Sequence, residues 1–154
     1  MQSGVEHSPP AELKTGNTWP LSFAQEGLWF LHELAPANTA YNICRLLRLQ
    51  GELNVEALRW SLNQIIARHE TLRTSFGVCD EQPCQIISPR SSLELVTEDL
   101  SNLAEVETWA TTIELAKTEA KQPFNLRQGP LLRARLLKLA GREHALILCL
   151  HHIV

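Results

Sequence analysis

Six consecutive apolar residues, from Ala145 to Leu150, restrict the possible fold of this chain more than any other feature. Successive side chains of a β-strand point to opposite faces of its sheet, so a strand that is apolar at every position needs cover on both faces. The run is much shorter than the roughly 18 residues that cross a membrane. The sequence therefore predicts a central, buried strand rather than an edge strand.

Composition sets the size and the class of the protein. The chain has 154 residues, of which 44% are hydrophobic and 20% charged, which is typical of one domain with a real core. The net charge is -3 and the basic residues are scattered, so neither nucleic acid nor an anionic membrane is an expected partner. No apolar core of a secretory signal occurs in residues 1–20, and a cytoplasmic location is expected.

Helix and strand signals divide the chain. Residues 1–18 show no apolar periodicity and are predicted to be a flexible leader, with the folded part at residues 19–154. Three helices are expected, capped by Ser22, by Asn54 and by Ser101 or Asn102. Extended segments are expected at residues 41–49, 75–87, 93–96, 131–139 and 145–150.

The second helix has the clearest pattern, and it bears on two arginines. Its apolar stripe consists of Val55, Leu58, Leu62, Ile65 and Ile66. At 100° per residue Arg73 continues this inward stripe, whereas Arg68 falls beside it. A buried guanidinium needs a carboxylate or several carbonyls as partners, so Arg73 is predicted to have a partner elsewhere in the fold. The alternative is that the helix has ended and Arg73 turns to solvent.

The third helix and the cysteines are predicted to be structural. The apolar stripe of the third helix consists of Val106, Trp109, Ala110, Ile113, Ala116 and Ala120, and Pro123 ends it. Cys44, Cys79, Cys84 and Cys149 form no CxxC pair and have no zinc-site spacing, so they are expected to be reduced and buried, with no metal site.

Two histidines, His151 and His152, follow the apolar strand and are the residues best placed for chemistry. Because neighbouring strand residues face opposite sides, only one of them can face a substrate channel. The other is expected to pack inward, with a hydrogen bond if it is buried. In an unrelated protein such a pair is more often structural or metal-binding, so the pair does not establish catalysis alone.

Four segments, in sequence order, resemble motifs of the condensation domains of nonribosomal peptide synthetases. The segments are Ser22-Phe-Ala-Gln-Glu-Gly-Leu-Trp-Phe-Leu31, Arg68-His-Glu-Thr-Leu-Arg-Thr-Ser-Phe76, Phe124-Asn-Leu-Arg-Gln-Gly-Pro-Leu-Leu-Arg133 and His151-His152, where the HHxxxD motif of that family begins. Two positions depart from the usual motifs, Gly27 in place of a common Arg and Asn125 in place of a common Asp. The aspartate of HHxxxD falls beyond Val154, so the chain is expected to be cut within that motif.

The resemblance implies an α/β fold, described as an α+β two-layer sandwich, that forms the N-terminal lobe of a two-lobed, chloramphenicol acetyltransferase-like domain. It implies amide formation between an aminoacyl or peptidyl thioester donor and an aminoacyl acceptor. Both substrates are carried on 4'-phosphopantetheine arms of carrier proteins, and no cofactor is bound directly. His152 would be the catalytic residue, and His151, Arg73 and Arg68 would support it, with Arg73 favoured over Arg68 as the partner of the motif's aspartate.

The same resemblance implies partners in a secondary-metabolite synthetase. These are carrier proteins, a neighbouring adenylation domain and the C-terminal lobe, without which the chain is expected to be inactive. Two alternatives stay open. One is a related HHxxxD acyltransferase that acylates an alcohol or amine, and the other is a noncatalytic interaction fragment. An epimerisation domain has a different first motif, and a heterocyclisation domain would have aspartate at position 151.

Overall fold

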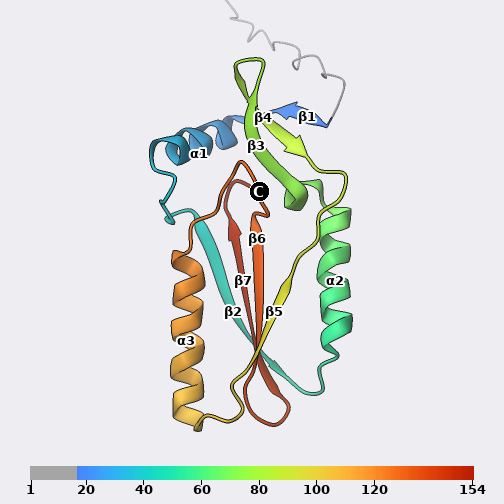
Figure 1. Ribbon diagram of the computed structural model, residues 1–154, viewed down its shortest axis with the longest axis vertical. Coiled ribbons are helices and arrows are strands. Elements are labelled where there is room, and N and C mark those ends of the chain that lie inside the picture. Colours follow the sequence, from blue (N-terminus) through green and yellow to red (C-terminus); the bar gives the residue numbers. More distant parts are fainter. Residues whose placement is uncertain (1–16) are drawn as a thin grey trace, which may run out of the picture.

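The structure of the protein is a computed structural model, which describes residues 17–154 (Figure 1). In chain order its elements are β1 (Thr18–Pro20), α1 (Phe23–Leu34), β2 (Asn42–Gln50), α2 (Val55–Arg68), the 3₁₀ turn η1 (Glu70–Arg73), β3 (Thr74–Cys79), β4 (Gln82–Ile87), β5 (Leu95–Asp99), α3 (Glu105–Lys121), β6 (Leu132–Lys138) and β7 (Glu143–His151). The first 16 residues of the predicted leader lie outside the described part. Thr18, its last residue, pairs with Ile86 in a strand.

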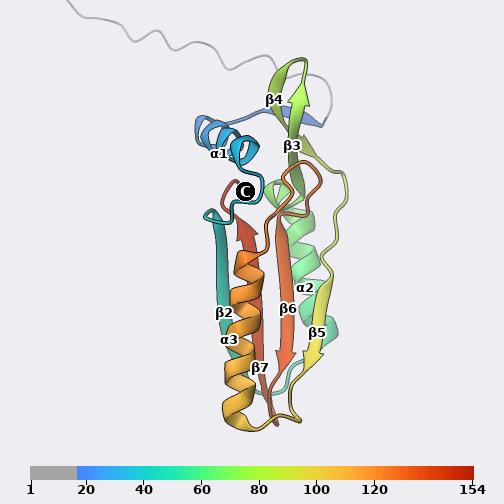
Figure 2. The ribbon, with the colours of Figure 1, turned by 60° about the vertical axis from the view of Figure 1, so that its left-hand side comes forward.

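Four strands form the main sheet, in the order β2-β7-β6-β5. Strand β7 is antiparallel to both β2 and β6, and β5 runs parallel to β6 at the edge. The apolar run is therefore a central strand, as the sequence predicted. A second sheet, in the order β1-β4-β3, lies with α1 beyond the end of the main sheet at which β7 terminates (Figures 1 and 2).

Helices cover both faces of the main sheet. Ala145, Ile147 and Cys149 of β7 face a core to which α3 contributes Trp109, Leu115 and Ala116. Leu146, Leu148 and Leu150 face the opposite core, to which α2 contributes Leu58, Leu62 and Ile66. Figure 1 shows α2 and α3 on opposite sides of the strands. The mixed helix-and-sheet lobe is as expected, with one layer more than the two-layer arrangement, because β7 is apolar toward both sides.

The predicted caps of the first two helices are present. The backbone N–H of Gln25 donates to Ser22 Oγ, and the side chain of Gln25 accepts from the backbone N–H of Ser22. Asn54 Oδ1 accepts from the backbone N–H of Ala57 at 3.0 Å. These side chains satisfy N–H groups that the first turn of a helix leaves without partners. Helix α1 ends before Ala35 and Pro36, as predicted.

The inward face of α3 differs from the predicted stripe. Val106 is 84% exposed and Ile113 is 44% exposed, whereas Thr108, Thr112 and Glu119 are buried. The two threonine hydroxyls donate to carbonyls one turn back, and Glu119 accepts from Arg135, so this polar face is satisfied inside the fold. Apolar periodicity located the helix but did not identify its polar buried residues.

The expectation of four reduced cysteines is wrong. The sulfur atoms are bonded in two pairs, Cys44–Cys149 and Cys79–Cys84. The first pair joins residues that are opposite each other on β2 and β7, and the second closes the β3–β4 hairpin. Pairs of this kind depend on strand register, which the spacing of cysteines in the sequence does not reveal.

Candidate active site at the end of strand β7

The two histidines lie at the junction between β7 and a tight turn. His151 is the last residue of the strand, and the backbone N–H of Val154 donates to its carbonyl, which closes the turn. The backbone N–H of His151 donates to Leu131 O, and that of His152 donates to Tyr41 O. Segments on either side of β7 therefore fix the backbone of both histidines.

His151 is the inward member of the pair. Its side chain is buried, and its Nδ1 accepts a hydrogen bond from the backbone N–H of Ile153 at 3.2 Å. Rings from three other segments surround it, those of His32, Tyr41 and Phe124, with centroids 6.2–6.5 Å away. Burial lowers the pKa of His151 from 6.5 to about 4, and the nearby His32 and His152 act in the same direction. His151 is therefore neutral at pH 7.

His152 is the exposed member of the pair. The structure thus separates the two imidazoles as the strand alternation predicted, with one in the core and one open to solvent. The backbone N–H of His152 is bonded to Tyr41 O, so its exposed imidazole is attached to a fixed backbone and is accessible to a reactant. Its catalytic role stays a prediction.

Helix α1 is tied to the same turn through Gln25. The amide nitrogen of Gln25 donates to Ile153 O at 3.1 Å and to Gln85 Oε1 at 3.3 Å. The other end of that amide closes the cap of α1 at Ser22. One side chain of the first motif therefore joins the helix start, the β4 strand and the histidine turn. The capping pattern was visible in the sequence, but the contact with Ile153 was not.

The two arginines of the second motif lie in different environments. Arg68, the last residue of α2, is exposed. The side chain of Arg73 is 14% exposed, and it donates to Ser88 O and to Glu70 Oε1. The helix ends before Arg73, as the alternative held, but the side chain turns inward, and Ser88 O is a partner from elsewhere in the chain, as predicted. Its Nε is buried and has no hydrogen-bond partner.

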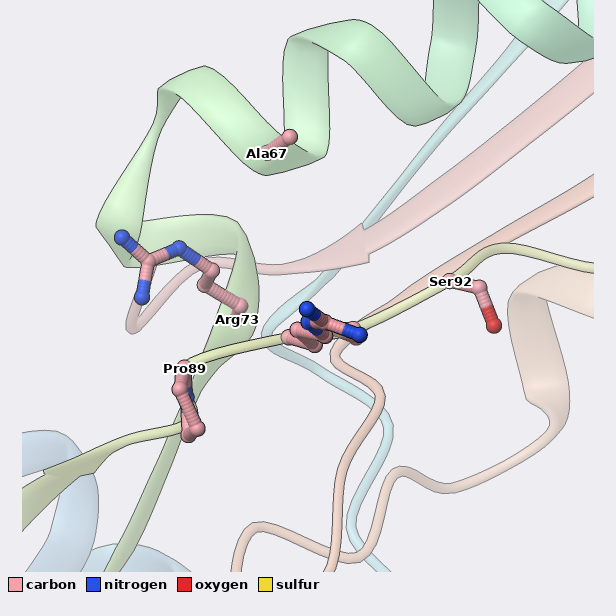
Figure 3. Close-up of a pocket in the computed structure, with 6 residues that line it drawn as sticks. Ala67, Arg73, Pro89 and Ser92 are labelled. Carbon is pink, nitrogen blue, oxygen red and sulfur yellow. The ribbon is translucent and has the colours of Figure 1, made fainter.

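A hollow of about 450 Å³ lies beside Arg73 (Figure 3). It is lined by Ala67, Arg73, Pro89, Arg90, Ser91 and Ser92. Figure 3 shows Arg73 extending from the turn after α2, with Pro89 and Ser92 on the neighbouring loop. The hydrogen bonds of Arg73 go to Ser88 and Glu70 rather than to either histidine, so the structure does not bring these predicted site residues into direct contact.

Sequence reasoning missed the side chains that surround His151. His32 comes from the last turn of α1, and burial is the main cause that lowers its pKa. His32 and Phe124 also line a surface hollow of about 360 Å³, together with Glu33, Pro36, Pro123, Asn125 and Arg127. Phe124 was noted only as part of a motif, and no spacing linked either residue to His151. The contacts arise from tertiary packing alone.

Two other features of the described residues concern metals and membranes. Within residues 17–154, no cluster of three or more His, Cys, Asp or Glu side chains is arranged to hold a metal ion. In the same part of the chain, none of the helices combines the length and apolar character that crossing a membrane requires.

Comparisons with known proteins agree on one family. The Condensation domain family matches residues 16–154. A linear gramicidin synthase polypeptide of Brevibacillus parabrevis is 44% identical over 99% of this chain and 2% of its own length. Chondramide synthase cmdD of Chondromyces crocatus is 42% identical over 99% of this chain and 4% of its own length. The chain thus spans a small fraction of these relatives.

Solved structures of the same family share the fold. The starter condensation domain of rhizomide synthetase RzmA superposes with a TM-score of 0.81 at 30% identity, over 88% of this chain and 34% of that chain. The first condensation domain of the calcium-dependent antibiotic synthetase, in complex with a substrate analogue, gives a TM-score of 0.78 at 26% identity, over 89% of this chain and 33% of that chain. The lobe described above corresponds to about a third of those chains.

Proposed function

The chain belongs to the condensation domain family, and from that premise we propose that it supplies the histidine face of an amide-forming site. The observation that carries the proposal is the exposed imidazole of His152, presented by a turn whose neighbouring His151 is buried. The family membership supports the substrate class, which is a carrier-bound thioester donor and an aminoacyl acceptor. A cytoplasmic multidomain synthetase is the proposed context.

The proposed reaction forms one bond and breaks another. The amine nitrogen of the acceptor bonds to the carbonyl carbon of the donor thioester, the carbon–sulfur bond breaks, and the sulfur leaves as a thiolate. An imidazole nitrogen of His152 accepts the proton that the amine loses and passes it to the thiolate, which becomes a thiol. The thiol and the acyl chains belong to 4'-phosphopantetheine arms of carrier proteins, with an adenylation domain as a further partner.

His152 does not need to be a strong base in this reaction. An α-amino group has an ordinary pKa of about 7.7–8.0, so a useful neutral fraction exists at pH 7. A general base contributes about 10²- to 10⁴-fold, whereas holding two reactants in register contributes up to about 7–11 kcal/mol of the barrier. Positioning is therefore the larger part of catalysis in this proposal, and the fixed backbone of the histidine turn serves it.

Arg73 and Arg68 are proposed as supporting residues of unequal weight. In this proposal the buried arginine pairs with the carboxylate of the HHxxxD motif. The free, buried Nε of Arg73 favours it for that role, because one donor of its guanidinium remains available. Arg68 is exposed, so water satisfies its guanidinium. His151 supports the site by filling the core beneath His152.

The experiment that tests the function measures amide formation between a loaded donor carrier and a loaded acceptor carrier. It compares this chain with a form extended through the second lobe, each with and without His152→Ala. His69→Ala is the matched control, because His69 is an exposed histidine at the end of α2. We expect activity in the extended form alone, reduced about 10²-fold or more by His152→Ala and unchanged by His69→Ala.

Two results would contradict the proposal. Full activity of the extended form with His152→Ala would remove the histidine from the reaction. Transfer of an acyl group to an alcohol but not to an amine would place the chain in the related acyltransferase class.

A further inference from the structure

The C-terminal turn of α3 is held by side chains from two strands of the main sheet. Asn42 Nδ2, on β2, donates to Ala120 O and to Gln122 O at 2.9 Å each. Arg133, on β6, donates to Glu119 O at 3.0 Å and to Gln122 O at 2.8 Å. The last carbonyls of a helix have no partners within the helix, and cationic donors also match its dipole. This end of α3 is therefore fixed to the sheet rather than frayed.

The strand positions of these two side chains bring the helix end to the histidines. Asn42 is the register partner of His151 in the β2–β7 pair. Arg133 is the register partner of Cys149, two residues before His151. Phe124, three residues after α3 ends, lies beside both Arg133 and His151. The guanidinium of Arg133 stacks on its ring, 3.8 Å from the centroid, and the same ring meets His151 edge to face.

The Glu119 carboxylate lies at the edge of the Arg133 guanidinium. The carboxylate is 3.4 Å from Arg133 Nε through Oε2, and it accepts two hydrogen bonds from Arg135 through Oε1, at 3.0 and 2.9 Å. The planar guanidinium of Arg133 thus has carbonyl acceptors and a carboxylate at its edge, and an aromatic ring against its face. A guanidinium held at its edge in this way offers the Phe124 ring a fixed surface to stack on.

We propose that Arg133 is a positioning residue, which holds the Phe124 ring against His151 and thereby fixes the turn that presents His152. The chain of contacts runs from Glu119 through Arg133 and Phe124 to His151. The Nδ1 of His151 accepts a hydrogen bond from the backbone N–H of Ile153, so the imidazole is tied to the turn. If the His151 imidazole shifts, the backbone of Ile153 and His152 moves with it. The consequence for catalysis rests on the proposed function, whereas the structural coupling does not.

Other groups also face His151, and the experiment must separate them from Arg133. His32 approaches from α1, Tyr41 from the segment before β2, and His152 from the turn itself. Among the ring contacts of the described residues, Phe124 is the one that joins both Arg133 and His151. A change that reaches the His151 ring from Arg133 is therefore expected to pass through Phe124.

The test uses the chain as it stands, with Arg133→Gln and the matched control Arg135→Gln. Both arginines lie on β6, face the same core and pair with Glu119, but the Phe124 stack belongs to Arg133. The signal is the NMR resonance of the His151 ring, which Phe124 shifts through its ring current. We expect Arg133→Gln to move this resonance and to raise the pKa of His151 toward its ordinary value, because water reaches the imidazole. Arg135→Gln should lower stability and leave both the resonance and the pKa of His151 unchanged.

Two further variants keep the proposal testable if Arg133→Gln unfolds. Arg133→Lys retains a cation over the Phe124 ring but loses the fork of donors, so it should move the His151 resonance less than Arg133→Gln does. Phe124→Leu keeps an apolar side chain but removes the edge contact, so it should reproduce the effect of Arg133→Gln on His151. Equal changes in His151 for Arg133→Gln and Arg135→Gln would overturn the proposal, as would an unchanged resonance in Phe124→Leu.

An activity readout then tests the catalytic consequence separately. In the form extended through the second lobe, Arg133→Lys should lower kcat for amide formation by about tenfold and leave KM unchanged, because the affected group acts on the reacting amine. A shifted His151 resonance without any change in kcat would refute the catalytic part. An active His152→Ala variant would instead contradict the proposed function itself.

Discussion

Replacing Glu119 by alanine tests the buried charge cluster of Glu119, Arg133 and Arg135. Glu119 is the least exposed carboxylate among the ion pairs of residues 17–154. The side chain of Glu119 is 11% exposed, and it receives Arg135 through two hydrogen bonds and Arg133 through an ion pair. Removing the carboxylate leaves Arg133 with its carbonyl acceptors and Arg135 with Glu98 as its remaining partner. Breaking a buried ion pair costs about 3–5 kcal/mol when the remaining charge has no compensation.

The exposure of the partners adjusts this estimate. The Arg133 and Arg135 side chains are 22% and 25% exposed, so water reaches part of each freed guanidinium. We therefore expect a loss near the lower end of the range, about 3 kcal/mol in the free energy of unfolding. Glu119→Gln keeps one acceptor oxygen and should lose about half as much, in line with the roughly twofold strength of charge-assisted hydrogen bonds.

The assay is urea unfolding followed by circular dichroism, with Glu114→Ala as the matched control. Glu114 lies on the same helix and pairs with Lys117, but both of these side chains are more than half exposed. Exposed pairs contribute little because solvent screens them. If Glu119→Ala costs no more than Glu114→Ala, the buried cluster does not stabilise the fold, and the reasoning is refuted.

Three other predictions follow from burial and pairing. Because the pKa of His151 lies at about 4 in the folded chain and near 6.5 when unfolded, the unfolded state binds its proton first, so stability should fall as the pH drops from about 6.5 to about 4. Urea midpoints across that range, compared with those of His151→Phe, check this, and an equal slope in the variant would contradict it. Trp29→Ala should cost about 3–5 kcal/mol, whereas Phe30→Ala should cost less than about 0.5 kcal/mol, since Trp29 is 5% exposed and Phe30 is 61% exposed; equal unfolding midpoints would refute the assignment of the buried face of α1. The Cys44–Cys149 bridge closes a span of 105 residues and should stabilise by about 4–5 kcal/mol, against about 2 kcal/mol for the five-residue Cys79–Cys84 span, which Cys44→Ser and Cys79→Ser test under non-reducing conditions; a larger loss for Cys79→Ser would contradict the loop-length argument.

Elements with a regular apolar pattern were predictable from the sequence. The stripe of α2 and its Asn54 cap indicated the helix and most of its inner face, although Ile65 is 47% exposed. The run at Ala145 to Leu150 indicated a central strand. Both signals arise because burial of apolar side chains follows the period of the element.

Features that depend on tertiary pairing were not predictable. The inner face of α3 is polar because Glu119 meets arginines of β6, which the pattern of α3 alone does not contain. The cysteine pairs follow from strand register. At the site, strand alternation predicted one buried and one exposed histidine, although His152 lies in the turn after β7. The rings around His151 come from three distant segments and were not predictable.

Departures from the family motifs have physical explanations in the structure. At Gly27 a Cβ atom would meet nothing within 4 Å, so the arginine that is common there would extend into open space. Asn125 uses its side-chain oxygen to accept from the backbone N–H groups of Arg127 and Gln128. An amide oxygen serves that turn as a carboxylate would, which explains why neither substitution disturbs the lobe.

The order of strands also determines how the lobe can assemble as it is synthesised. Strand β7, the last of the four main-sheet strands along the chain, lies between β2 and β6, and its register pairs join it to β2 from about a hundred residues away. Until β7 leaves the ribosome, β2 has no neighbour and the main sheet cannot close. Such distant pairing slows folding, because the entropy of closing the long loop must be lost before the contacts form. The histidine turn is thus completed at the same moment as the sheet that supports it, and an emerging chain that lacks β7 would present unpaired strand edges to chaperones.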